Sequence, residues 1–212
     1  MSIADLRQEY AKHELDASHV ADDPITQFRD WFDEVQAADI HEPNAMTLAT
    51  AASNGQPSAR IVLLKGLDER GFHFYTNYES QKGTEITHNP KVSLVFLWKP
   101  LERQVRIQGV AERLPDDEST EYFHSRPRGS QLGAWASPQS RVIDGRATLH
   151  ENKKAVEATY ADADVIPRPP HWGGYVVRPE RVEFWQGRPN RLHDRLCYRK
   201  DGDAWRLERL AP

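Results

Sequence analysis

The sequence predicts a mainly β fold with inserted helices, arranged as a closed or nearly closed barrel. Roughly eight or nine short segments have the apolar patterning of strands. Tight turns rich in Gly, Asn and Asp join most of these segments, which is typical of antiparallel hairpins. A barrel would remove the exposed edges that so many strands would otherwise create.

Helical patterns occur in a few places along the chain. Residues 1–20 are charged and weakly apolar, and Ser2 can cap a short helix from residue 3 to about residue 13, so we expect a mobile arm. Asp23 and Pro24 are typical of the N-cap and first position of a second helix with a buried apolar stripe. Further helices are predicted at residues 81–88, 115–125, 131–135 and 149–160.

The first three predicted strands form an antiparallel meander, and two more strands follow a short helix. Residues 92–98 are nearly continuously apolar, which indicates a strand buried on both faces. Residues 166–170 form a stiff, proline-rich connector, but the segment beyond it is too short for an independent core, so one domain is expected over residues 21–212. The predicted strands are 46–50, 59–64, 72–76, 92–98, 103–112, 174–177, 181–185, 196–198 and 205–210.

Composition excludes several classes of function. The net charge of −4 argues against nucleic acid as a partner, and no apolar run is long enough for a membrane helix. The single cysteine, Cys197, permits no internal disulfide and fits a cytoplasmic location. The sequence has no His/Cys cluster with metal-binding spacing, and it lacks the glycine-rich phosphate motifs of dinucleotide-binding and P-loop proteins.

Two segments in the first half have the residues of a phosphate site. Arg60 and Lys65 bracket an apolar strand, and by parity they face opposite sides unless the strand bulges or Lys65 lies beyond its end. The alternative is a buried strand with ordinary charged ends. Ser80 and Lys82 stand at a helix N-terminus, which favours an anion, although Ser80 could simply cap the helix.

A third segment places a phenol, a guanidinium and a hydroxyl close together. Tyr122 and Arg126 lie four residues apart on one helix face, and Ser130 follows one irregular turn later. This combination suits a phosphate, while the alternative is an exposed basic helix end that complements its own dipole. Gln104 would matter only if a polar heterocycle lay opposite it.

The C-terminal segment from Arg191 to Arg195 gives the fourth candidate. If it is extended, Arg191, His193 and Arg195 share one face and could hold an anion. The alternative is a solvated edge strand. Together with the two phosphate-competent clusters and the many aromatic residues, this face indicates a protein that binds planar, phosphorylated heterocycles.

These motifs, in this order, resemble the pyridoxamine 5′-phosphate oxidase family. The resemblance runs from residue 6 to residue 212. The specific motifs are Arg60–Lys65, Tyr75–Tyr78, Tyr122–Pro127, Gly133–Trp135, Glu183–Gly187 and Arg191–Arg195.

The resemblance implies a split β-barrel FMN-binding fold and a homodimer with FMN at the subunit interface. It implies that Lys65, Tyr122, Arg126 and Ser130 bind the substrate phosphate, that Arg191 and His193 act at the pyridine ring as catalytic residues, and that Arg7 and Tyr10 belong to an N-terminal lid. One subunit would bind FMN through Arg60, Ile61, Val62, Leu63, Leu64, Lys65, Tyr75, Thr76, Gln81, Lys82 and Gln104, and the other through Gln139, Ser140, Trp185 and Arg195.

The implied reaction is oxidation of pyridoxine or pyridoxamine 5′-phosphate to pyridoxal 5′-phosphate, with a hydride passing to FMN and molecular oxygen becoming hydrogen peroxide. The alternative is a split-barrel flavin carrier, or a reductase with another substrate. One departure concerns Gln81, where many relatives have a second basic residue, and this change is expected to weaken FMN affinity without abolishing binding.

Overall fold

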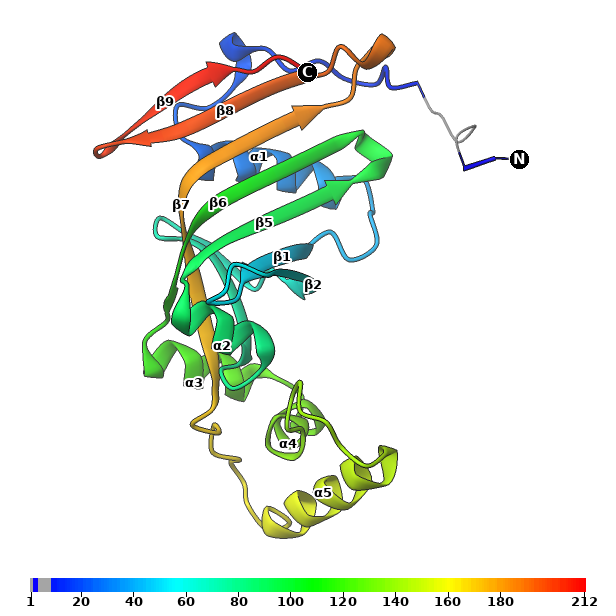
Figure 1. Cartoon of the computed structure of the whole chain (residues 1–212), viewed down its shortest axis with the longest axis vertical. Helices are drawn as coiled ribbons and strands as arrows, with labels where there is room; N and C mark the ends of the chain where they lie inside the picture. The colour runs from blue at the N-terminus through cyan, green and yellow to red at the C-terminus, as the bar shows by residue number, and fades with distance from the viewer. Residues whose placement is uncertain (1, 4–8) are drawn as a thin grey trace.

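The computed structural model describes residues 2, 3 and 9–212, and it confirms a mainly β fold with inserted helices (Figure 1). Nine strands in the described part form one curled sheet, in the order β2-β1-β5-β6-β7-β4-β3, and β8 and β9 continue from β7. The strands are β1 (Ala45–Ala51), β2 (Pro57–Leu63), β3 (Gly66–Asp68), β4 (Gly71–Asn77), β5 (Lys91–Trp98), β6 (Arg103–Arg113), β7 (Trp172–Gln186), β8 (Asp194–Asp201) and β9 (Ala204–Arg209).

The helices lie on the inner side and at one end of this sheet (Figure 1). As predicted, Asp23 caps the first long helix, because its carboxylate accepts hydrogen bonds from the backbone N–H groups of Ile25 and Thr26. The helices are α1 (Pro24–Ala37), α2 (Gln81–His88), α3 (Asp116–Ser125), α4 (Arg128–Ala136) and α5 (Arg146–Thr159), with short 3-10 turns η2 (Ala17–His19), η3 (Lys99–Leu101) and η4 (Pro189–Arg191).

Strand β7 connects the two halves of the molecule. Its first half pairs with β4 and its second half with β8, while β6 runs beside both halves. The sequence predicted two separate strands here, and this was wrong. The strand continues through Pro179 because the register of β6 shifts between Gln108 and Gly109, opposite the proline that cannot donate a ladder hydrogen bond.

The core lies between α1 and the sheet. Phe28 is fully buried and contacts the rings of Phe72, Phe96 and Trp98. Strand β5 is not buried on both faces as predicted, because its residues alternate and Leu97 is 64% exposed. The side of β5 that carries Leu97 is not covered by α1.

The N-terminal segment also differs from the prediction. Residues 9–16 form no helix, and they lie along the end of the sheet through hydrogen bonds described below. Over residues 9–13 the predicted helix does not form, because the backbone N–H groups of Ala11 and Lys12 find a side-chain partner elsewhere in the fold. Residues 4–8 of the predicted helix lie outside the described residues. None of the helices in the described part of the chain has the length and hydropathy that a membrane span requires. Residues 2, 3 and 9–212 include no cluster of three His, Cys, Asp or Glu side chains that could hold a metal ion.

Candidate functional site

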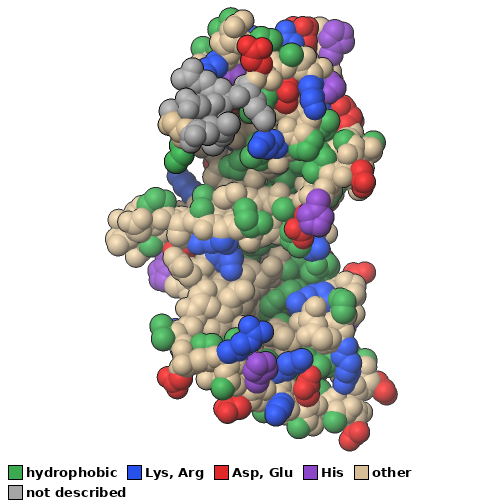
Figure 2. All heavy atoms as spheres, turned by 90° about the vertical axis from the view of Figure 1, so that its right-hand side faces the viewer, with side chains coloured by type: hydrophobic (Ala, Val, Ile, Leu, Met, Phe, Trp, Pro, Cys, Tyr) green, Lys and Arg blue, Asp and Glu red, His purple; other side chains and the backbone are tan. Residues whose placement is uncertain are grey.

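A cavity of about 680 Å3, which we call the basic pocket, lies between β2, β4, α3 and α4. Its size is within the usual range for small-molecule sites. Four cations line it, Arg60, Lys65, Lys82 and Arg126, and the described lining includes no carboxylate. Figure 2 shows Lys and Arg side chains over the lower half of the molecule, interspersed with Asp and Glu towards its edge, so the basic character belongs to the pocket lining and not to the whole surface. The pocket therefore favours an anionic ligand.

The end of β2 explains how Arg60 and Lys65 reach the same pocket. The strand ends at Leu63, so Lys65 lies beyond the regular alternation that would place it opposite Arg60. The backbone N–H of Lys65 donates instead to the carbonyl of His73 on β4, at 2.9 Å. This is one of the two geometries that the sequence left open, and it places both cations around one ligand volume.

Arg60 is fixed by a buried carboxylate. Its Nη2 lies 3.4 Å from Oε2 of Glu85, and its Nη1 donates to the Thr50 hydroxyl at 2.5 Å. Burial alone would raise the pKa of Glu85, but hydrogen bonds from Ser58, Thr50 and Gln81, with the charge of Arg60, outweigh burial and lower it to about 2. Glu85 therefore stays ionised and partly neutralises Arg60.

The N-terminus of α2 contributes Lys82. Ser80 is fully buried and caps the helix by accepting from the backbone N–H of Gly83, which confirms the capping alternative for this serine. Lys82 lines the pocket, and its Nζ lies 3.2 Å from Oε1 of Gln139. Burial, and then repulsion from Arg60, lower the pKa of Lys82. Binding of an anion would relieve both effects.

Arg126 differs from Arg60 because it has an unused donor. Its guanidinium lies 4.5 Å from the centre of the Trp172 ring, and its buried Nη1 has no hydrogen-bond partner among the described residues. Burial lowers the pKa of Arg126, as expected for a cation without a paired anion. The alternative of an exposed helix end is therefore wrong for Arg126. Ser130, on α4, lines the same pocket from an exposed position.

Aromatic rings form one side of the pocket. The rings of Tyr75 and Tyr122 stack with centroids 3.8 Å apart, and the Trp172 ring lies parallel to both within 6.2 Å. Burial, followed by the neighbouring Tyr122, raises the pKa of Tyr75 to about 12, so its hydroxyl stays protonated and available as a donor. Trp172 was not among the predicted site residues, although it lines the pocket.

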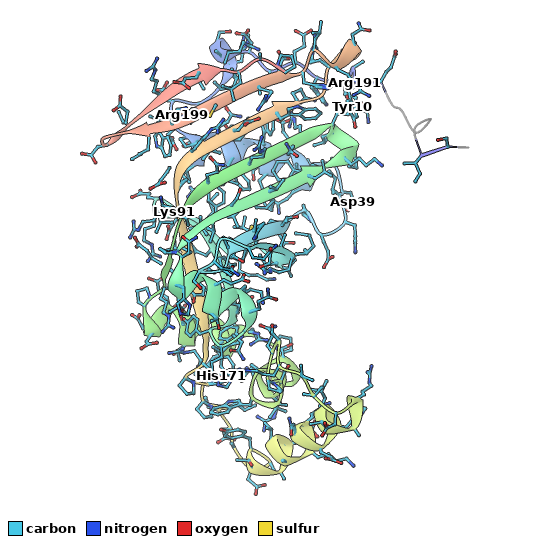
Figure 3. All side chains as sticks on the ribbon, viewed as in Figure 1. Tyr10, Asp39, Lys91, His171, Arg191 and Arg199 are labelled. Carbon is cyan, nitrogen blue, oxygen red and sulfur yellow. The ribbon has the colours of Figure 1, made fainter. Side chains whose placement is uncertain are left out.

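A second group, which we call the aromatic wall, consists of Tyr10, Trp185 and His193. The rings of Trp185 and His193 have centroids 4.6 Å apart, and Tyr10 meets both at 5.8 and 6.0 Å. Figure 3 places Tyr10 at the same end of the sheet as Arg191. Gln104 is the cross-strand neighbour of Trp185 and lines a hollow of about 300 Å3 beside Tyr10.

The protonation state of His193 follows from its hydrogen bond. The backbone N–H of Arg188 donates to His193 Nδ1 at 3.1 Å, so Nδ1 carries no proton. Burial, followed by repulsion from Arg191, lowers the pKa of His193 and favours the same neutral form. The neutral ring then keeps its proton on Nε2, where it can serve as a donor.

The segment from Arg191 to Arg195 is extended only from Asp194 onward. The predicted alternation of Arg191, His193 and Arg195 on one face, which both alternatives assumed, was therefore wrong. Arg191 belongs to the turn η4 and has a positive φ of 64°, as does Asn190 with 55°, because Pro189 begins a tight turn there. Strand β8 begins only at Asp194. Arg195 is not free either, since it is 2.8 Å from the buried Glu183 and donates to the carbonyl of Ala211.

The remaining predicted residues divide between the two regions. Gln139, expected on the opposite subunit from Lys82 and Thr76, bonds to both within one chain. Leu64, Gln81 and Ser140 do not line the basic pocket, and Gln81 bonds instead to Glu85. Arg7 lies outside the described residues. Ile61, Val62, Leu63, Tyr75 and Thr76, which were predicted to bind FMN, line the pocket.

Comparisons with known proteins find similar sequences along nearly the whole chain. Residues 32–160 match the family model described as pyridoxamine 5′-phosphate oxidase, and residues 172–212 match a model described as the pyridoxine 5′-phosphate oxidase C-terminal dimerisation region. The chain is 73% identical to the pyridoxine/pyridoxamine 5′-phosphate oxidase of Salinibacter ruber, over 99% of both chains. It is 57% identical to that of a Cyanothece species, over 100% of this chain and 99% of the relative.

Solved structures show the same fold. The match to PhzG from Burkholderia lata, solved in complex with tetrahydrophenazine-1-carboxylic acid, has a TM-score of 0.86 at 32% identity and covers 92% of this chain and 95% of that one. A pyridoxamine 5′-phosphate oxidase-related, FMN-binding protein from Nostoc punctiforme matches with a TM-score of 0.68 at 16% identity, covering 91% of this chain and 100% of that one. These matches confirm the predicted split β-barrel. The chain belongs to the pyridoxine/pyridoxamine 5′-phosphate oxidase family.

Proposed function

We propose that the chain is an FMN-dependent oxidase that converts pyridoxamine 5′-phosphate and pyridoxine 5′-phosphate to pyridoxal 5′-phosphate while molecular oxygen is reduced to hydrogen peroxide. The observation that carries this proposal is the basic pocket, where four cations and no lining carboxylate among the described residues stand beside stacked aromatic rings. Cofactor and substrate in this reaction are both planar rings with a phosphate, and the pocket suits both features. A cytoplasmic location, expected from the lone cysteine, is part of the proposal.

The residues present fit FMN. Lys82 is buried, its pKa is lowered, and it lies beside Gln139 and the N-terminus of α2, which together suit a phosphate. Arg60 and the backbone of β2 would complete the FMN site from the other side of the pocket. FMN supplies the ring that accepts a hydride and passes electrons to oxygen.

The substrate phosphate would be held by a different part of the same pocket. Arg126 provides a planar guanidinium with an unused donor, and Tyr122, Ser130 and Lys65 add two hydroxyls and a second cation. Arg126 is held by Trp172, so little side-chain entropy is lost when it binds a phosphate. This group orients the substrate by its phosphate and leaves the pyridine ring free to lie against other residues.

Arg191 and His193 would act on the pyridine ring. A neutral His193 can donate from Nε2 to an oxygen substituent on the ring, and the positive charge of Arg191 can stabilise negative charge that develops as the substrate is oxidised. Neither residue lines the basic pocket of its own chain. Arg191 lies at the opposite end of the sheet from α3 and α4 (Figures 1 and 3).

A homodimer would solve this separation, because a second copy could bring its aromatic wall to the basic pocket of the first. The matched dimerisation region, residues 172–212, contains Trp185, Arg191 and His193. Ile61 and Leu97, which are 65% and 64% exposed, stand on the same uncovered face of the β2-β1-β5 sheet. Exposed apolar side chains on one face are typical of a surface that a partner covers. The proposal treats residues 21–212 as one domain and residues 1–20 as its lid.

A second candidate is oxidation of another reduced heterocycle. It is favoured by the match to PhzG, whose structure contains a tetrahydrophenazine carboxylic acid. The 73% identity to the Salinibacter ruber oxidase, against 32% to PhzG, favours the first candidate. A flavin carrier without oxidase activity would have no use for the unpaired donor of Arg126.

The test is an aerobic assay of the purified protein loaded with FMN. Pyridoxine 5′-phosphate, pyridoxamine 5′-phosphate and tetrahydrophenazine-1-carboxylic acid are offered separately. Hydrogen peroxide is measured for all three compounds, aldehyde for the two phosphates, and the change in ring absorbance for the phenazine compound. The proposal predicts aldehyde and peroxide in equal amounts from the two phosphates. Turnover of the phenazine compound alone would support the second candidate, and bound flavin without any turnover would indicate a carrier.

A further inference from the structure

The N-terminal arm, residues 9–16, lies in a defined seat at the end of the sheet. Both backbone N–H groups at Ala11 and Lys12 donate to the same carboxylate oxygen of Glu102, at 2.9 and 3.1 Å. Lys12 also donates from Nζ to the carbonyl of Pro100 at 2.8 Å. Two hydrogen bonds to one carboxylate are stronger than the same bonds to a neutral acceptor, so Glu102 is the main anchor of this part of the arm.

The backbone at Glu102 is shaped for this role. Its φ of 55° lies in the left-handed region, and this turns its side chain out from the end of β6. The Glu102 carbonyl accepts from the backbone N–H of Gly187 at 2.8 Å and from the side-chain amide of the fully buried Gln186 at 3.2 Å. The anchor is therefore tied to the strand that carries Trp185.

Gly187 provides the space that Tyr10 occupies. A Cβ atom placed on Gly187 would lie 2.7 Å from both Cβ and Cγ of Tyr10, which is closer than such atoms can approach. Tyr10 can therefore reach the rings of Trp185 and His193 only because this position has no side chain. A Cβ atom on Gly187 would also lie 3.0 Å from Cβ of Glu102, so Glu102 is adjacent to the space that Tyr10 occupies.

The rest of the arm follows the loop that carries Arg191 and His193. The backbone N–H of Leu15 donates to Asp194 at 3.2 Å, and Arg188 donates to the His13 carbonyl and to Glu14. Leu15 itself is buried. The arm is thus held at both ends of the segment from residue 11 to residue 15, with Tyr10 directed onto the aromatic wall.

From these contacts we infer that Glu102 and Gly187 are positioning residues that seat Tyr10 against Trp185 and His193 and so complete the aromatic wall. Neither residue contacts the basic pocket, so both act through Tyr10. The inference rests on the proposed function for its effect on catalysis, while the seating of the arm can be measured without any substrate.

Limited trypsin digestion of the FMN-loaded protein tests the seating directly. Cleavage after Lys12 requires that segment to leave Glu102. Glu102→Ala removes the charged acceptor, and Gly187→Ala places a Cβ against Tyr10. Each variant is therefore expected to accelerate this cleavage about tenfold. Glu102→Gln keeps an acceptor without the charge and should fall between wild type and Glu102→Ala. The matched controls are Glu151→Ala, an exposed glutamate on α5, and Gly145→Ala, where an added Cβ meets nothing within 4 Å.

Steady-state kinetics then separate positioning from general damage. If the wall closes over the substrate, the three variants raise KM for pyridoxine 5′-phosphate, on the order of tenfold for Glu102→Ala, with a smaller change in kcat and no change in FMN content. Cleavage after Lys12 at the wild-type rate in both Glu102→Ala and Gly187→Ala would overturn the inference. Equal acceleration at trypsin sites throughout the sheet would overturn it too, because it would mean general unfolding. If the variants accelerate cleavage after Lys12 as expected but the protein oxidises neither phosphate, the inference about the arm stands and the proposed function is refuted.

Discussion

In the basic pocket, the charged side chains come from β2, the residues just after it, α2 and the C-cap of α3, and partners nearby in the fold hold most of them in place. Glu85 holds Arg60, and Gln139 holds Lys82. The aromatic wall is assembled differently, from the N-terminal arm, β7 and the loop before β8, through single contacts between distant segments. The pocket is therefore expected to determine affinity for phosphates, and the wall to close over the bound ring and support that affinity. Arg191, in the loop beside the wall, is expected to determine how fast a bound substrate reacts.

The largest effect is expected at Arg191. Replacing it with alanine should lower kcat by about 100-fold or more, as is typical when a charged group that stabilises a transition state is lost. FMN content should stay near the wild-type value, because Arg191 does not line the basic pocket. Flavin absorbance and turnover, measured on the same sample, check both statements. Near-normal turnover would remove Arg191 from the catalytic residues.

Arg126→Ala tests the other region. Loss of its guanidinium should raise KM for pyridoxine 5′-phosphate by about 10- to 100-fold, which corresponds to a charged hydrogen bond of about 1.5–3 kcal/mol. The effect on kcat should be smaller. Arg128→Ala, in which the lost cation bonds backbone carbonyls outside the pocket, is the matched control. A variant with normal KM and lost flavin would show that Arg126 binds the FMN phosphate and not the substrate phosphate.

Glu85→Gln should affect stability and leave the chemical step unchanged. Because the pKa of Glu85 is lowered from 4.5 to about 2, its ionised form contributes stability that is fully present above pH 4.5 and is lost as the pH falls towards 2. The variant should be less stable than wild type by on the order of 2–3 kcal/mol at neutral pH, and about half of that difference should be gone near pH 3. Urea unfolding across this pH range measures it. A difference that does not depend on pH would mean that the charge of Glu85 is unimportant.

The contrast between the two regions also explains what could be predicted from the sequence. The pocket arises from local features, such as the cap at Ser80 and the spacing of Tyr122 and Arg126 on one helix, and these were recognised as candidates. Its buried partner Glu85 was missed, because nothing in the local pattern shows that this face of α2 packs on β1 and β2. The family resemblance supplied most of the remaining residues.

The wall could not be derived in the same way. Alternation in the segment 191–195 predicted three aligned cations, but Asn190 and Arg191 adopt positive φ and end that alternation before β8 begins. The helix predicted for the N-terminal arm does not extend over residues 9–13, because Glu102, about ninety residues away in sequence, accepts hydrogen bonds from the backbone N–H groups of Ala11 and Lys12. Such contacts depend on the folded sheet, and no local pattern contains them.

The central claim is that one active site forms from the basic pocket of one copy and, from another copy, the aromatic wall together with the neighbouring Arg191. Co-expression of Arg126→Ala and Arg191→Ala chains with two different tags, followed by purification of the mixed dimer, tests this most directly. At low substrate concentration each variant alone should be nearly inactive. The mixed dimer should regain about half of the wild-type activity, since one of its two sites then receives an intact residue from each copy. Activity no higher than that of the two separate variants would contradict the shared site.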